Sequence, residues 1–206
     1  MHVLMIVYHY WPQPAGGAER QCRLLSQALV RAGVKVTVLT GRTARFQPPR
    51  EEDRGVSIVR VPLAEMFLRR PPVSQPSGKA DGESGRDRRF LSWLQSFAVK
   101  LLRAVNILMF IRGARQYALR TKSFDLIHVH IAVWISGFAA VLGRRLGIPV
   151  LCKESTMPCF PKSPPYVPWR RHWDRLRSSN RFIALHPAMA DQLADRGIPR
   201  GRIAVI

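Results

Sequence analysis

Short apolar runs alternate along the chain with longer stretches whose apolar residues recur at helical spacing. Residues 2–7 (His-Val-Leu-Met-Ile-Val) are almost wholly apolar, which is typical of a strand buried on both faces of a parallel sheet, although periodicity alone also fits a buried helix. In residues 17–32 the leucines and alanines share one helical face, and Gly33 follows as the expected stop. Residues 34–40 alternate β-branched side chains. This opening therefore predicts a strand–loop–helix–strand unit with a right-handed connection.

The same alternation continues to the end of the chain. Further strands are predicted at 56–61, 124–130, 148–152, 181–185 and 203–206, and further helices at 133–146, 169–178 and 187–196. Such an order predicts an α/β fold, a Rossmann-like doubly wound parallel sheet. A chain of 206 residues is long enough to bury one sizeable core, so we expect a single domain over residues 1–206.

Two stretches interrupt this order. Residues 69–89 consist mainly of Pro, Ser, Gly, Lys, Arg, Asp and Glu, which leaves little to bury, so they predict a disordered insertion. Residues 157–168 contain five prolines among aromatic residues and predict a loop that is ordered or gates a site.

Residues 90–117 predict a long helix that is apolar on most sides. Lys100 and Arg103 interrupt the apolar arc well short of the roughly 20 residues that a membrane span needs. The helix then either packs on the sheet as core or lies in a membrane interface, with Arg86, Arg88, Arg89 and Lys100 meeting anionic headgroups. Both hold if one face packs inward while the leading end contacts lipid.

The charge balance indicates an anionic partner. Lys and Arg total 33 against 13 Asp and Glu, a formal charge of +20, which fits nucleic acid, acidic lipid or phosphate without choosing among them. Cys22, Cys152 and Cys159 are scattered and form no Cys-x-x-Cys pair, which argues against a zinc site and a disulfide framework. A reduced, cytoplasmic location fits better. The first residues lack a basic region and a cleavage site, so they predict a strand rather than a signal peptide.

Three groups of residues are candidates for chemistry. Gly16-Gly17 opens the first helix, where free N–H groups favour an anion and missing Cβ atoms let it come close, although a plain tight turn explains the pair equally well. His128 and His130 share one face of a strand, and His130 falls at its carboxyl end, where open α/β sheets bind ligands. The polar run at 153–155 (Lys-Glu-Ser) ends the next strand in the same way.

Five motifs in register resemble the N-terminal domain of family 4 retaining glycosyltransferases, whose GT-B fold joins two Rossmann-like domains. The motifs cover nearly the whole chain and comprise Gly-Gly-Ala-Glu-Arg at 16–20, Asp-Leu-Ile-His-Val-His at 125–130, Gly-Ile-Pro-Val at 147–150, Phe-Ile-Ala-Leu-His-Pro-Ala-Met at 182–189, and Arg-Gly-Ile-Pro-Arg-Gly-Arg-Ile-Ala-Val-Ile at 196–206.

This resemblance implies transfer of a sugar from a nucleotide-sugar donor to a glycan or lipid-linked acceptor, with retention and without a metal or other cofactor. Gly16 and Gly17 would face the donor diphosphate, and Glu19 would help to set their loop. His130, the implied catalytic residue, would lie near the reacting sugar with His128 behind it. The acceptor side would be lined by Lys153, Glu154 and Ser155.

The resemblance also sets limits on this chain. The family usually continues into a second, donor-binding domain that the sequence lacks, so we expect no turnover unless a separate C-terminal domain completes the enzyme. A location at the cytoplasmic face of a membrane would suit a lipid-linked acceptor.

Two other classes stay open. An NAD(P)-binding Rossmann protein would need Gly-x-Gly-x-x-Gly, whose third glycine is missing, although Arg42 could serve a 2′-phosphate. A basic nucleic-acid-binding domain would use the charge, yet no motif for specific nucleic acid is present.

Overall fold

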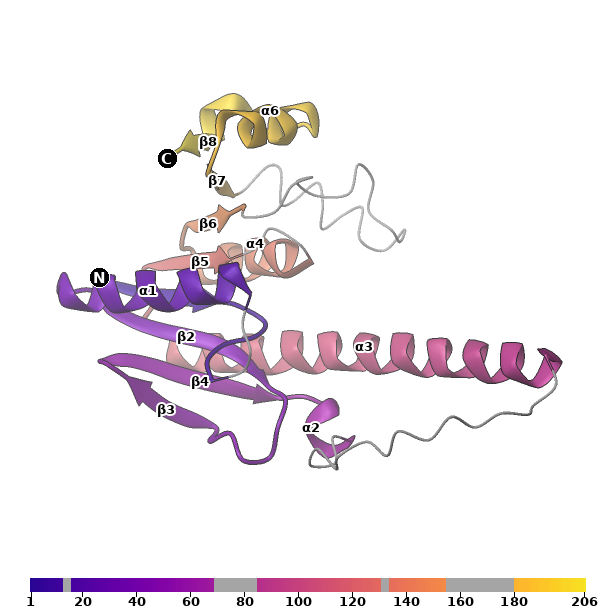
Figure 1. Ribbon diagram of the computed structural model, residues 1–206. Coiled ribbons are helices and arrows are strands. Elements are labelled where there is room, and N and C mark those ends of the chain that lie inside the picture. The colour runs from indigo at the N-terminus through magenta and orange to yellow at the C-terminus, as the bar shows by residue number, and fades with distance from the viewer. Residues whose placement is uncertain (13–15, 69–84, 131–133, 155–179) are drawn as a thin grey trace.

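The computed structural model of the protein describes residues 1–12, 16–68, 85–130, 134–154 and 180–206 (Figure 1). At 68, 85–95 and 134 it describes the backbone alone. The predicted proline-rich loop at 157–168, the predicted helix at 169–178, Cys159 and Ser155 lie outside these residues.

An eight-stranded sheet in the order β3-β4-β2-β1-β5-β6-β7-β8 forms the centre of the fold. Its neighbouring strands are parallel except for β3 and β4, which pair antiparallel at one edge. The strands are β1 (His2–Ile6), β2 (Lys35–Arg42), β3 (Arg50–Asp53), β4 (Val56–Pro62), β5 (Leu126–His130), β6 (Val150–Lys153), β7 (Arg181–Ala184) and β8 (Ile203–Val205). The predicted doubly wound α/β sheet is confirmed. All five residues of β1 are buried, as the apolar run predicted.

Helices cover both faces of the sheet unequally. The helix α1 (Gly17–Arg31) packs against the face formed by Val3, Met5, Val36 and Val38, and among the described helices it is the one that covers this face. The opposite face is covered by α3 (Gly85–Thr121), α4 (Trp134–Leu146) and α6 (Pro187–Asp195). This division follows from right-handed crossovers, because the chain leaves β1 toward β2 in one direction and leaves β5 toward β6 in the other.

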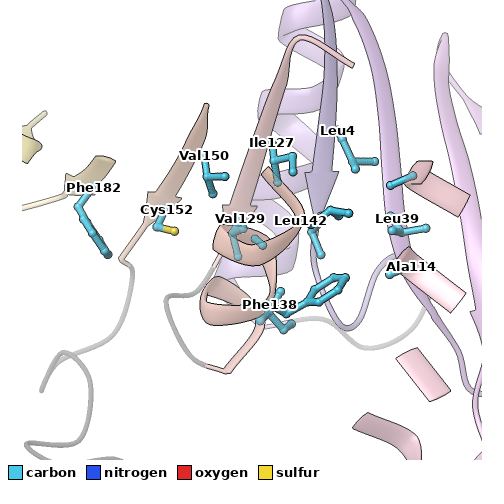
Figure 2. Packing of buried hydrophobic residues seen from close by; sticks show 14 of the residues in the cluster. Leu4, Leu39, Ala114, Ile127, Val129, Phe138, Leu142, Val150, Cys152 and Phe182 are labelled. Carbon is cyan, nitrogen blue, oxygen red and sulfur yellow. The ribbon is translucent and has the colours of Figure 1, made fainter. Parts of the chain in front are cut away.

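The larger core lies between the sheet and the helices α3 and α4. Figure 2 shows Phe138 and Leu142 of α4 beside Val129 of β5, with Leu39 of β2 next to Ala114 of α3. These side chains are buried, and the cluster continues through Phe182 of β7. The core thus joins both halves of the sheet into one body.

Three short elements were not predicted, and one of them is the 3₁₀ helix η2 (Arg200–Arg202), which leads into β8. β3 has the sequence Arg-Glu-Glu-Asp, which shows no alternation of apolar and polar residues and therefore does not predict a strand. It pairs with β4 at the sheet edge. The helix α2 (Glu65–Leu68) has one turn, too short to show periodicity. Its first residue is tied to α3, because the backbone N–H of Glu65 donates to Asn106 Oδ1 at 3.2 Å.

The helix α3 is longer than predicted. It starts at Gly85, so residues 85–89, assigned to the insertion from their polar composition, belong to the helix, while 69–84 lie outside the described residues. Its second half packs on the sheet, as the core interpretation predicted, through Asn106, Phe110, Ala114 and Ala118. In the part of the chain that the structure describes, no helix is long and apolar enough to cross a membrane.

Candidate functional site

The candidate site lies where α1 begins, at the carboxyl edge of the parallel strands. Gly16 is extended, with φ −69° and ψ −175°, and its carbonyl accepts a hydrogen bond from the Arg20 N–H at 3.2 Å. Glu19 stands in the first turn of α1 and is half-buried. A helix start at this edge directs partial positive charge toward the space above β1 and β5.

The two glycines differ in the space around them. A Cβ on Gly16 would come within 3.0 Å of a Glu19 carboxylate oxygen, whereas a Cβ on Gly17 would meet nothing within 4 Å. Neither residue has a positive φ that would require glycine. Among the described residues no neighbouring atom requires glycine at 17, so this part of the backbone is open to close approach by another molecule.

His128 and His130 form a stacked pair on β5. Their ring centroids are 4.6 Å apart and the rings are inclined by 24°. Both are almost fully buried, and neither Nε2 atom has a hydrogen-bond partner among the described residues. The prediction that the two side chains share one face is confirmed. Buried polar groups are normally hydrogen-bonded, so these two nitrogens keep an unused hydrogen-bonding capacity toward groups beyond the described residues.

Both histidines are neutral at physiological pH. Burial lowers the pKa of His128 to about 4 and that of His130 to about 3. The nearby Lys153 ammonium lowers both pKa values further, and His128 adds to the effect on His130. The pair can thus exchange hydrogen bonds with a ligand without adding charge.

Lys153 supplies positive charge to the same face. The register of β5 and β6 places Lys153 beside His130, and burial lowers the pKa of its ammonium. The Lys153 charge also acts on the Cys22 thiol on α1, where it opposes the rise in pKa that burial causes. The structure therefore brings together the start of α1, His128, His130 and Lys153.

The other predicted residues are placed differently. Glu154 follows the last residue of β6 and is 1% exposed, and its backbone N–H donates to the Ile183 carbonyl at 2.9 Å. Ser155 lies outside the described residues. The contribution of these two residues to an acceptor site stays a prediction.

A set of contacts that holds the loop after β1, made by Arg60 and Arg23 with Trp11, was not predicted. Arg60 on β4 is buried, donates to the Trp11 carbonyl at 2.8 Å and forms an ion pair with Glu51. The Trp11 ring packs 4.5 Å from the guanidinium of Arg23, which in turn pairs with Asp53. The sequence contained one indication of these contacts, because Arg60 stands within the alternating strand at 56–61, where a charged residue needs a partner if it is buried. These contacts fix the backbone of Trp11, which leads toward Gly16 and Gly17.

Arg42, the residue that kept a dinucleotide interpretation open, is engaged elsewhere. Its Nε donates to the Gln47 carbonyl at 2.6 Å, and its second guanidinium nitrogen donates to the Arg45 carbonyl at 2.8 Å. The side chain thus closes the turn after β2.

The fold agrees with the comparisons to known proteins. Residues 16–206 match the family described as Glycosyl transferase 4-like domain, so the chain belongs to this family. The fold is that of the GT-B glycosyltransferases. No curated protein sequence matches the chain.

Solved structures resemble the whole chain at low sequence identity. Sucrose-phosphate synthase from Thermosynechococcus elongatus is 15% identical with a TM-score of 0.58, and the match covers 100% of this chain and 47% of that one. Anabaena Alr3699/HepE, solved in complex with UDP-glucose, is 13% identical with a TM-score of 0.57, and covers 100% and 43%. UDP-GlcNAc 2-epimerase from Methanocaldococcus jannaschii is 12% identical with a TM-score of 0.54, and covers 100% and 45%.

The chain thus spans less than half the length of these three proteins. Because one of them is an epimerase, the fold alone does not fix the reaction.

Proposed function

We propose that the chain is the acceptor-side domain of a retaining glycosyltransferase, which transfers a sugar from a nucleotide-sugar to a glycan or lipid-linked acceptor. In this proposal the start of α1 at Gly16-Gly17 receives the donor diphosphate, His130 contacts the transferred sugar or the acceptor, and a second domain supplies the remaining donor contacts. No metal takes part.

The proposal is carried by two features of the carboxyl edge, the unobstructed helix start at Gly17 and a buried histidine with an unused nitrogen. A Cβ at Gly17 would touch nothing, and the His130 Nε2 atom has no partner in the described part of the chain. The first feature leaves room for a ligand and the second offers it a hydrogen bond. Both belong to residues that the family resemblance assigns to the site.

The charges suit a diphosphate next to a neutral sugar. The N-terminus of α1 and the Lys153 ammonium supply positive potential, which favours a developing anion on the leaving diphosphate. His128 and His130 stay neutral and can orient sugar hydroxyl groups without competing for that charge. That Anabaena HepE was solved with UDP-glucose supports the class of donor.

Binding of inorganic pyrophosphate to the 206-residue chain tests the position of this site. In two-dimensional NMR spectra we expect pyrophosphate to shift the backbone amide signals of Gly17 and Ala18 and the imidazole signals of His130. The Gly33 amide, beyond the other end of α1, should not move.

Gly17→Ala is the sharpest variant, because the added methyl group meets no atom of the described residues within 4 Å and yet occupies the proposed approach path. We expect an unchanged melting temperature, since alanine is tolerated in a helix better than glycine, and at least tenfold weaker pyrophosphate binding. Unchanged affinity, or shifts spread over all basic surfaces, would contradict the proposal.

A further inference from the structure

The helix α3 has an inner half that packs and a leading half that projects. Asn106, Phe110, Ala114 and Ala118 recur every four residues and are buried against the sheet. The residues from Ser96 to Val105 are exposed except for Leu102, which is half-buried. Figure 1 shows this part of α3 continuing well beyond the ends of the strands. Because α3 leads into β5, its projecting half extends past the carboxyl edge, where the candidate site lies.

Large apolar side chains cover the outward side of this helix. Phe110 points toward the sheet. Leu101 lies nine residues before Phe110 and Leu108 lies two residues before it, so at 3.6 residues per turn both leucines point away from the sheet. Leu101 is 54% exposed, Leu108 66% and Phe97, one turn before Leu101, 54%. Phe67 on α2 is also exposed, and α2 is fastened to α3 through the Glu65–Asn106 hydrogen bond.

From Arg88 onward the same helix carries positive charge and no acidic residue, whereas its first turn contains Asp87. Between 88 and 124 the sequence has eight Lys and Arg residues and no Asp or Glu. Lys100, Arg112 and Arg115 are exposed, and Arg112 and Arg115 continue the outward side that begins with Phe97 and Leu101. Glu65 on α2 is the acidic residue bonded to this region through its backbone.

This combination favours a lipid surface over a second copy of the chain. Helices that pair with themselves set opposite charges against each other, whereas two copies of α3 would set basic residues against basic residues. Nucleic acid would match the charge, but binding through its phosphates would not bury the exposed leucines. An anionic bilayer interface accommodates basic groups at the headgroups and apolar side chains below them.

We infer that the outward side of α3, from Phe97 to Arg115, docks together with α2 onto an anionic lipid bilayer and lies in its interface. Leu101, Leu108 and Phe97 enter the acyl boundary, and Lys100, Arg112 and Arg115 contact the headgroups. Docking in this way holds the carboxyl edge of the sheet close to the membrane surface. The inference does not depend on the proposed transferase function, because it concerns binding alone.

Vesicle co-sedimentation of the 206-residue chain tests this docking. We expect binding to vesicles that contain phosphatidylglycerol, at least tenfold weaker binding to pure phosphatidylcholine vesicles, and release from both at high salt. Two variants separate the contributions: Leu101→Ser with Leu108→Ser, and Lys100→Ser with Arg112→Ser and Arg115→Ser. Each should weaken binding at least tenfold, and neither should lower the melting temperature, since the side chains are exposed.

Matched controls keep the test specific to this surface. Arg31→Ser with Lys35→Ser and Arg144→Ser removes the same charge from exposed positions on other elements, and Leu24→Ser removes an exposed leucine of α1. These controls should change binding less than twofold. An equal loss in the controls, equal binding to both vesicle types, or no binding would overturn the inference. The inference would also be overturned if sedimentation velocity showed a dimer that Leu101→Ser converts to monomer. It would equally be overturned if duplex DNA displaced the chain from vesicles by binding the same residues.

Discussion

Burial sets the chemistry of the two site histidines. In water an imidazole has a pKa near 6.5, but desolvation by the surrounding chain and the Lys153 charge bring the pKa of His128 to about 4 and of His130 to about 3. The two rings therefore enter any reaction near neutral pH as hydrogen-bonding groups and not as cations. Their spacing on the strand was visible in the sequence. Their burial was not, because it depends on α1 and on neighbouring strands that only the fold brings together.

These shifts predict a loss of stability in mild acid. Folded-state pKa values below the unfolded value mean that the unfolded chain binds more protons between about pH 6.5 and pH 4, so stability is present above pH 6.5 and falls as the pH decreases. For two such groups the free energy of unfolding should drop by roughly 4 kcal/mol between pH 7 and pH 5. Urea denaturation followed by circular dichroism at both pH values measures this drop.

The double variant His128→Gln with His130→Gln provides the control. Glutamine does not titrate, so most of the pH dependence should disappear, and the remaining drop reports other groups such as His2, whose pKa burial also lowers. An unchanged drop in this variant would show that the pair is not the source.

At the scale of elements, a single glycine lets α3 approach the sheet. A Cβ on Gly113 would lie 2.4 Å from a methyl carbon of Val61 on β4, so the helix crosses the strand closely at this point. In an isolated helix, alanine is about 1 kcal/mol more favourable than glycine. Here the clash should outweigh that preference.

Gly113→Ala is therefore expected to destabilise the chain by roughly 1–3 kcal/mol, because a methyl group must be accommodated in a packed contact. Gly17→Ala, where space is open, serves as the matched control and should change stability little. The effect should vanish when the same substitution is made in a Val61→Ala background, since the opposing methyl groups are gone. Thermal unfolding of the parent chain, Gly113→Ala, Val61→Ala and the double variant measures this. An equal loss of stability from Gly113→Ala in the parent and in the Val61→Ala background would rule out the clash.

The sequence predicted these elements where apolar periodicity was strong. The buried strands β1, β2 and β5 and the helices α1, α4 and α6 appear within a few residues of their predicted bounds. Two of the failures share a cause: β3 and the first turns of α3 are made of charged residues, whose composition indicates exposure but says nothing of backbone order. The division of α3 into packed and projecting halves was equally hidden, since Leu101 and Phe110 look alike in the sequence and differ only in what lies beside them.

At the scale of the whole molecule, the sheet exposes much of the face on which the site lies. The helix α1 covers it over β1, β2 and β4, while on the same side Arg181 and Ala204 are exposed and Leu151 and Ile183 are half-buried. The residues at this edge comprise a helix start, two neutral imidazoles and one lysine. Such a set can orient a sugar, but a leaving diphosphate carries more negative charge than these groups balance, and transfer needs positioned groups on both sides of the reacting atoms.

We therefore predict that the 206-residue chain alone forms no glycosidic product from a panel of nucleotide-sugars with glycan and lipid-linked acceptors. Mass spectrometry of the products and release of the free nucleotide measure this. Joining the chain to the donor-binding domain of a family relative should give turnover, and His130→Gln in that fusion should lower kcat at least a hundredfold, because His130 contacts the reacting sugar in our proposal. The matched variant His9→Gln, just beyond β1, should leave kcat within a factor of two. Turnover by the chain alone would contradict the need for a second, donor-binding domain. An equal loss of kcat in the His130→Gln and His9→Gln variants would show that His130 has no specific role in the reaction.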